Sequence, residues 1–378
     1  MRRHDLDWLR VIVFALLIFY HVGMFFVPWE FHIKNNHIYD WLTYPMKFLN
    51  QWRLPILFVI SGMGTYYALQ KRSGRQFAFE RIRRLFVPLA FGMLFIIPPQ
   101  VYVERLVKNQ ITGHYFDFWP LKAFTGIYPE GNLSWHHLWF LPYLLLFSLV
   151  LIPVFLYFRD RPQNHFNSWL RRMVKSPWKI YLFIMPLYLA EAFIEPFFAV
   201  THALIGDWFA LLNYSILFLF GFLLITVKDT FWMTVEKHRK LFLIAGVICF
   251  TIMLFIVKTY EDSVYRHFTV AFFKVANLWS WILTLFGFAS KYLNRKSEML
   301  TYCNEAVYPF YILHQTIMIL LAYNVMNLDW SFGLKASIMI VGTFGFSWLF
   351  YAYLVRRWKY VRPLFGLKKK ILTESSKK

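Results

Sequence analysis

The stretch DWLRVIVFALLIFYH, residues 7–21, places an arginine and a histidine inside one long apolar segment. On an α-helix, eleven steps of about 100° bring the chain back to within about 20° of its starting direction. Arg10 and His21 are therefore expected on one face, roughly 16 Å apart along the helix axis, with Asp7 near the same face. Because an ionisable side chain is costly inside a lipid bilayer, the pair marks a candidate functional site.

The composition of the whole chain is that of an integral membrane protein. Of its 378 residues, 58% are hydrophobic and 22% aromatic, whereas only 16% are charged. Apolar segments of about 20 residues are long enough to cross a bilayer, and each must be helical because lipid offers the backbone no hydrogen-bond partner. We predict an all-α bundle of about ten transmembrane helices, with the amphipathic stretch 41–52 leading into the second and able to lie along the interface. The predicted spans are 8–27, 53–70, 85–103, 137–158, 178–198, 208–227, 241–257, 268–289, 303–325 and 333–355.

The formal net charge of +21 does not indicate a nucleic-acid partner, because the basic residues alternate between loops. Of the 41 Lys and Arg residues, 31 fall in segments that the predicted spans place on the same side as both termini. This positive-inside pattern predicts that both termini are cytoplasmic, with a basic tail from about 356 to 378 near anionic lipid headgroups. Because no loop is long enough to fold alone, we expect residues 1–378 to form a single integral membrane domain.

Further polar residues fall inside or beside the predicted spans. Arg81 and Arg84 lie one helical turn apart before the third span. They could bind phosphate groups, or they could only set the membrane orientation and contact lipid headgroups. His21 could also be a packed histidine that bonds a neighbouring helix, and Arg10 could reach the lipid headgroups. The remaining polar residues together indicate a polar cavity within the bundle; they are Arg53, His136, His137, Glu191, Glu195, Asn213, Lys274, Glu305 and His314.

Several common site motifs are missing from the sequence. It contains no phosphate-binding glycine loop, no nucleophilic-serine elbow and no zinc signature, and Cys249 and Cys303 lack metal-ligand spacing. We therefore expect no metal and no permanently bound cofactor. Ser61 and Gly62 are interpreted as small residues that let two helices approach closely. On the residues alone an enzyme, a proton-coupled transporter and an envelope scaffold all stay open, because buried ionisable residues suit the first two almost equally.

Taken together, the motifs resemble the membrane-bound acyltransferase family 3. Its arginine, ten residues and histidine on the first membrane helix are matched by Arg10 and His21, and its cytoplasmic Arg-x-x-Arg element by Arg81 and Arg84. The tracts LFVISG (57–62), LWFL (138–141) and YILH (311–314) are also similar to the family. The stretches 21–29 and 50–55 resemble its glucan biosynthesis protein C branch, which is associated with succinylating periplasmic glucans.

The resemblance implies an O-acyltransferase of the bacterial inner (cytoplasmic) membrane. Such an enzyme moves an acyl group, succinyl or acetyl, from cytoplasmic acyl-CoA to a hydroxyl of an extracytoplasmic glucan or other carbohydrate. Arg81 and Arg84 would then hold the coenzyme A phosphates and His21 would be the general base, with Arg10 positioning the donor and Asp7 orienting Arg10. Direct transfer and a covalent acyl-histidine both stay open, and no residue is assigned to stabilise the thioester oxygen. The candidate substrate contacts are His136, Arg53, His314 and Glu305.

Overall fold

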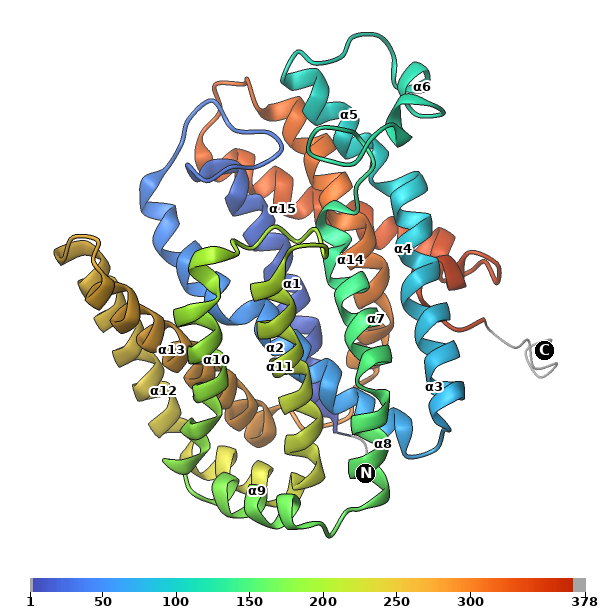
Figure 1. The fold of residues 1–378 in the computed structure, drawn as a ribbon. Coiled ribbons are helices and arrows are strands. Elements are labelled where there is room, and N and C mark those ends of the chain that lie inside the picture. The colour runs from blue at the N-terminus through green and yellow to red at the C-terminus, as the bar shows by residue number, and fades with distance from the viewer. Residues whose placement is uncertain (1–2, 370–378) are drawn as a thin grey trace. The chain divides into compact units, whose positions relative to one another are not determined.

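The computed structural model describes residues 3–369, and most of them are helical (Figure 1). No strand occurs in this range, where Ile127 and Leu133 form one isolated bridge. Within it, eight helices are long and apolar enough to cross a membrane, or nine if the pair His136–Val150 and Ile152–Asp160, bent by 52°, counts as one span. The all-α polytopic bundle predicted from the sequence is thereby confirmed. The eight are α1 (His4–Phe26), Gly74–Val107, Lys179–Phe197, α11 (Trp208–Thr226), α12 (Lys228–Thr259), α13 (Val264–Tyr292), α14 (Glu298–Val325) and Phe332–Val355.

Nine of the ten predicted spans fall on these eight helices and the bent pair. The segment predicted at 53–70 lies in α2 (Thr43–Leu69), a 27-residue helix that is not among those apolar enough to span by composition. Arg53 and a run of small and hydroxyl-bearing residues lower the mean hydropathy of α2. The stretch 41–52 does not form a separate interfacial segment, because α2 continues through it from Thr43.

The described chain groups into two compact units. The first unit comprises Met1–Val13, Lys47–Phe79 and Tyr143–Leu300, and the second Phe14–Met46, Glu80–Pro142 and Thr301–Lys378. Helix α1 therefore gives its first residues to one unit and the rest, from Phe14, to the other. The single domain expected for residues 1–378 stays a prediction.

Three helix contacts organise the first unit. Helices α12 and α13 run side by side as a long hairpin, and α10 (Ile184–Phe193) packs on α13 (Figure 1). Helices α2 and α11 meet with their backbones in contact: a Cβ built on Gly62 would stand 1.9 Å from the carbonyl oxygen of Phe218, and one on Gly221 would stand 1.9 Å from that of Val59. Small residues allow such close crossings, so the packing role predicted for Gly62 is confirmed.

The helical stretch Gly74–Val107, which belongs to the second unit from Glu80 onward, is kinked. From Gly74 to Val107 the chain passes through α3 (Gly74–Arg81), α4 (Val87–Phe91) and α5 (Pro98–Val107), with π-helical turns between them. Pro98 and Pro99 supply no N–H donors at the last break. The carbonyl of Leu94 instead accepts from Trp119 Nε1 at 2.9 Å, and that of Ile96 from Thr316 Oγ1 at 2.7 Å. The kink is thus fixed by side chains that satisfy the freed carbonyls.

A lysine caps the end of α1. Lys34 donates to the carbonyl oxygens of Met24 and Trp29 at 2.7 Å each, and also to that of Val27. These carbonyls lie at and just beyond the last turn of α1, where they have no partner within the helix and where the helix dipole favours a cation. Burial lowers the pKa of Lys34 to about 8, so the ammonium group still carries its three protons at neutral pH. The loop after α1 is held in place by this cap.

We expect Gly62→Ala to destabilise the protein, because the new methyl group would overlap the backbone of α11. Overpacking of this kind costs about 1–3 kcal/mol. Gly64→Ala, on the same helix, is the matched control, since a Cβ there would meet no atom within 4 Å. Thermal unfolding of both variants in detergent, followed by tryptophan fluorescence, makes the comparison. Equal Tm values would contradict the close crossing of α2 and α11.

Candidate functional site

Two histidines from different helices contact each other in the second unit. The rings of His21, on α1, and His314, on α14, stack with centroids 5.0 Å apart at an interplanar angle of 21°. His21 Nδ1 lies 2.8 Å from His314 Nε2. His314 is 1% exposed and His21 is half-buried, so the pair is sheltered but can be reached from the His21 side.

The hydrogen bonds of His314 determine which nitrogen of each ring carries a proton. His314 Nδ1 lies 2.8 Å from the carbonyl oxygen of Tyr311 and 3.2 Å from that of Phe310. A carbonyl oxygen can only accept, so Nδ1 is the donor and, in the neutral ring, Nε2 is the acceptor. His21 Nδ1 therefore donates to His314 Nε2, and His21 Nε2 keeps its lone pair. A nitrogen in this state can take a proton from a hydroxyl, as a general base does.

A third histidine packs against this pair and is itself oriented. The His137 and His314 rings meet edge to face at 5.0 Å between centroids. His137 Nε2 donates to the carbonyl of Ile312 at 3.1 Å, which makes Nδ1 an acceptor for the amide of Gln100 at 3.4 Å. The hydroxyl of Tyr311 donates to the backbone oxygen of His137 at 2.6 Å. These bonds join α14 to the residues that precede α7 (Phe140–Val150).

Two buried glutamines extend the network along α5 and α14. Gln100 Nε2 also donates to Thr316 Oγ1 at 2.6 Å, and its Oε1 accepts from Gln315 Nε2 at 3.2 Å. Gln315 Nε2 further lies 3.0 Å from His32 Nε2. Each of these donors has an acceptor, as buried polar groups require. The network leads from the histidine pair to a charged cluster.

That cluster centres on Glu104, a carboxylate 1% exposed in α5. One carboxylate oxygen lies 2.5 Å from His32 Nδ1. The other accepts from Lys108 Nζ at 2.7 Å and from the hydroxyl of Tyr128 at 3.0 Å. Burial and the negative charge of Glu104 raise the pKa of Tyr128 to about 12, so its hydroxyl remains a donor. The ring of His136 meets that of His32 edge to face at 4.4 Å between centroids.

A buried arginine holds the loop that covers this cluster. The guanidinium of Arg105 donates to Asn132 Oδ1 at 3.1 Å and to Gln110 Oε1 at 2.6 Å. It also donates to the carbonyl oxygens of Pro129 and Gly131 at 2.5 and 2.7 Å. The loop 109–135 is therefore shaped around one side chain of α5, and it keeps Tyr128 next to Glu104.

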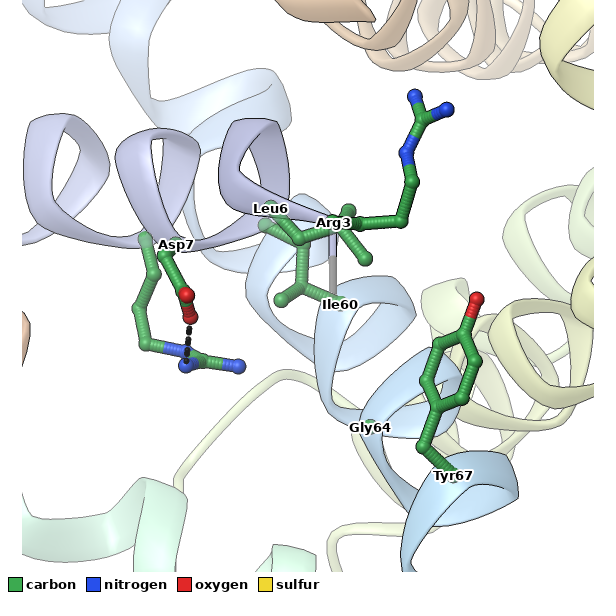
Figure 2. A pocket seen from close by; sticks show the side chains of 7 residues that line it. Arg3, Leu6, Asp7, Ile60, Gly64 and Tyr67 are labelled. Atoms are coloured by element: carbon green, nitrogen blue, oxygen red, sulfur yellow. Dashed lines mark hydrogen bonds and ion pairs between the residues drawn. The ribbon is translucent and has the colours of Figure 1, made fainter. Parts of the chain in front are cut away.

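A separate cavity in the first unit contains the other two predicted catalytic residues. It has a volume of about 300 Å³ and is lined by Arg3, Leu6, Asp7, Arg10, Ile60, Gly64 and Tyr67 (Figure 2). Arg10 NH1 stands 3.4 Å from Asp7 Oδ1, the contact drawn as a dashed line, and the Arg10 side chain is 33% exposed. Arg10 thus offers a partly exposed guanidinium to this cavity, with Asp7 beside it.

The predicted phosphate-binding arginines lie where α3 ends. Arg81 is the last residue of α3, and Arg84 falls in the π-helical turn Ile82–Phe86 that follows. The prediction that Arg81 and Arg84 stand one turn apart assumed a regular α-helix. A π turn rotates the chain less per residue, so that spacing does not apply here. Arg84 is exposed, with NH1 3.7 Å from Glu80. Its backbone oxygen accepts from the hydroxyl of Tyr308 at 3.2 Å.

The predicted substrate contacts do not form one group. His314 contacts His21, and His136 lies in the Glu104 cluster. Glu305 forms an ion pair with Arg362 at 2.6 Å, and that arginine, 6% exposed, attaches the short helix Arg362–Phe365 to α14. Arg53 is buried in α2 of the first unit. The sequence analysis missed Gln100, Glu104 and Gln315; the signal for Glu104 was a carboxylate in an otherwise apolar helix, and for Gln315 its place beside His314.

Comparisons with known proteins add an independent line of evidence. The acyltransferase family 3 model, described as an acyltransferase domain, matches residues 3–352. Among curated proteins, the chain is similar to the glucans biosynthesis protein C of Salmonella paratyphi B, Salmonella heidelberg and Salmonella schwarzengrund. Each is 25% identical over 166 residues, which is 43% of this chain and 41% of the relative, so the match spans less than half of these relatives. No solved structure matches the chain.

Proposed function

This chain belongs to the acyltransferase family that matches residues 3–352, and we propose that it is a membrane O-acyltransferase that moves a succinyl or acetyl group from acyl-CoA to a carbohydrate hydroxyl. The donor would come from the cytoplasm, and the acceptor, a glucan or another glycan, would lie outside the inner membrane of a bacterium. The observation that supports the chemistry is the oriented pair of His21 and His314. A transporter would move its substrate unmodified, whereas a transferase leaves an ester on the acceptor.

In the proposed reaction His21 Nε2 accepts the proton of the acceptor hydroxyl while the hydroxyl oxygen attacks the thioester carbonyl. The C–S bond then breaks, the acyl group remains on the acceptor oxygen as an ester, and the proton returns from His21 to the coenzyme A thiolate. General-base catalysis of this kind contributes typically about 10²–10⁴-fold. His314 is a positioning residue here, because it receives the Nδ1 proton of His21 and so keeps the lone pair on Nε2.

The donor would bind at the cytoplasmic end of α1. Arg10 contributes a guanidinium to the cavity shared with Gly64, and guanidinium groups bind phosphate well. Exposed Arg84 and neighbouring Arg81 are the further cations proposed for the coenzyme A phosphates. Along α1 itself, eleven residues at 1.5 Å each separate Arg10 from His21, roughly 16 Å, which suits an extended pantetheine arm.

The histidine pair makes a prediction for three variants. We expect His21→Ala to abolish ester formation, and His314→Leu to lower kcat by about 10²-fold, because His21 then loses the acceptor for its Nδ1 proton. His314→Gln retains a side-chain oxygen and should restore part of kcat. The KM for acyl-CoA should change less than about twofold, since the pair acts on the hydroxyl. The assay measures acyl transfer to periplasmic glycans by purified, correctly folded variants.

Two results would contradict this mechanism. Normal product formation by His21→Ala would remove His21 as the base. Full kcat in His314→Leu, or equal losses in His314→Leu and His314→Gln, would show that His314 does not act through its acceptor nitrogen.

The cavity makes a separate prediction for the donor. Gly64→Leu should raise the KM for acyl-CoA at least about tenfold, because the new side chain would extend into space lined by Arg10 and Tyr67. Gly345→Leu, on α15 (Phe332–Leu349), is the matched control, since a Cβ there also meets no atom within 4 Å. An unchanged KM in Gly64→Leu would exclude this cavity from donor binding.

A further inference from the structure

Three side chains in the second unit are placed as the ligands of one metal ion. His32, Glu104 and His136 each offer one ligand atom, and these atoms all lie within 4.8 Å of one another. We propose that His32, Glu104 and His136 form a binding site for a divalent transition metal, most suited to Zn²⁺. Two imidazoles and one carboxylate are a common zinc ligand set. The proposal rests on these contacts and does not depend on acyl transfer.

An ion pair between His32 and Glu104 alone does not explain the state of His136. Its Nε2 is buried and has no hydrogen-bond partner in residues 3–369. Its backbone has a φ of 38°, in the left-handed region that a histidine adopts at a cost. A buried, unsatisfied nitrogen and a strained backbone are both unfavourable, and a metal ion at Nε2 would satisfy the nitrogen.

The surroundings of Glu104 suit a ligand carboxylate. Lys108 and Tyr128 both bond Oε1, the oxygen that does not face His32. Oε2 is left for His32 and for an ion. Ligand carboxylates in metal sites are usually hydrogen-bonded in this way, and such outer partners orient them.

Binding requires a small movement and one proton shift. Ligands at about 2.1 Å from Zn²⁺ stand roughly 3.4 Å apart in a tetrahedron, so His32 Nδ1 and Glu104 Oε2, now at 2.5 Å, must separate by about 1 Å. The proton on His32 Nδ1 moves to Nε2, which then needs an acceptor. Gln315, whose amide nitrogen lies 3.0 Å from His32 Nε2, supplies one when its amide turns to present Oε1. A fourth ligand position remains for water.

The sequence could not reveal this site, because its ligands come from three separate segments. His32 lies in the loop after α1, Glu104 in α5, and His136 before α7. Known zinc signatures are read from short spacings, whereas here 72 residues separate His32 from Glu104. The expectation of no metal rested on the missing signature alone.

The test measures Zn²⁺ on the full-length protein, purified in detergent without a histidine tag and stripped with EDTA. After equilibration with Zn²⁺ and dialysis, elemental analysis should give one ion per chain, and Co²⁺ in its place should show the visible absorption of a tetrahedral site. His136→Gln and Glu104→Gln should lose this ion. Gln315→Met, which keeps all three ligands but removes the outer acceptor, should weaken binding about 10–100-fold in a chelator competition.

His114→Gln is the matched control, since it removes an exposed imidazole of the same loop and no ligand, and it should bind Zn²⁺ as tightly as the natural chain. A rise in Tm on adding Zn²⁺, present in the natural chain and absent in His136→Gln, would report binding even if a variant is less stable. No bound ion on the natural chain would overturn the proposal. Equal Zn²⁺ on the natural chain and the two ligand variants would also overturn it, by placing the ion elsewhere. Neither result would bear on the base role of His21, which is judged by its own variants.

Discussion

The hydrogen bond from His314 Nδ1 to the carbonyl of Tyr311 is the contact on which the candidate chemistry depends. A histidine buried among membrane helices has no water to bond, so its polarity must be satisfied by protein groups. Here the acceptor is a carbonyl one turn earlier in the same helix, so α14 itself sets the tautomer. From that single donor follow the acceptor state of His314 Nε2, the donor state of His21 Nδ1 and the lone pair on His21 Nε2.

The same requirement explains why the polar network lies at the prolines. At the break around Pro98 and Pro99 the backbone N–H of Gln100 bonds Ile97 instead of Ile96, and the carbonyl of Ile96 accepts from the hydroxyl of Thr316. The Thr316 oxygen then accepts from Gln100, two residues after the break. A kink that would be costly in lipid thus becomes an attachment point between α5 and α14. His137 is held by a backbone carbonyl and the two glutamines by neutral side chains, which gives all three fixed orientations without a charge.

What the sequence could predict follows from periodicity and length. It placed Arg10 and His21 on one helix, and it identified the apolar spans and the close approach at Gly62. It assumed a regular α-helix where Ile82–Phe86 is a π turn. It named His314 but gave it a substrate role, since its partner His21 lies 293 residues away and pairings over such separations leave no local pattern.

The hydrogen bonds of Gln315 and Gln100 also limit how a change at the Glu104 cluster can alter the tautomers of His21 and His314. If Gln315 turns to accept from His32, its Oε1 faces the Oε1 of Gln100, and Gln100 must turn as well. Thr316 can then donate to Gln100 only by giving up its bond to the carbonyl of Ile96, because a hydroxyl has one proton. His137 Nδ1, an acceptor because Nε2 donates to Ile312, would face an oxygen and lose its bond. That bond, at 3.4 Å, is the longest in this network and the weakest by geometry. Reorienting the whole network therefore costs two contacts, the bond of His137 to Gln100 and one bond of Thr316, whereas His314, bonded to its own helix, keeps its tautomer throughout.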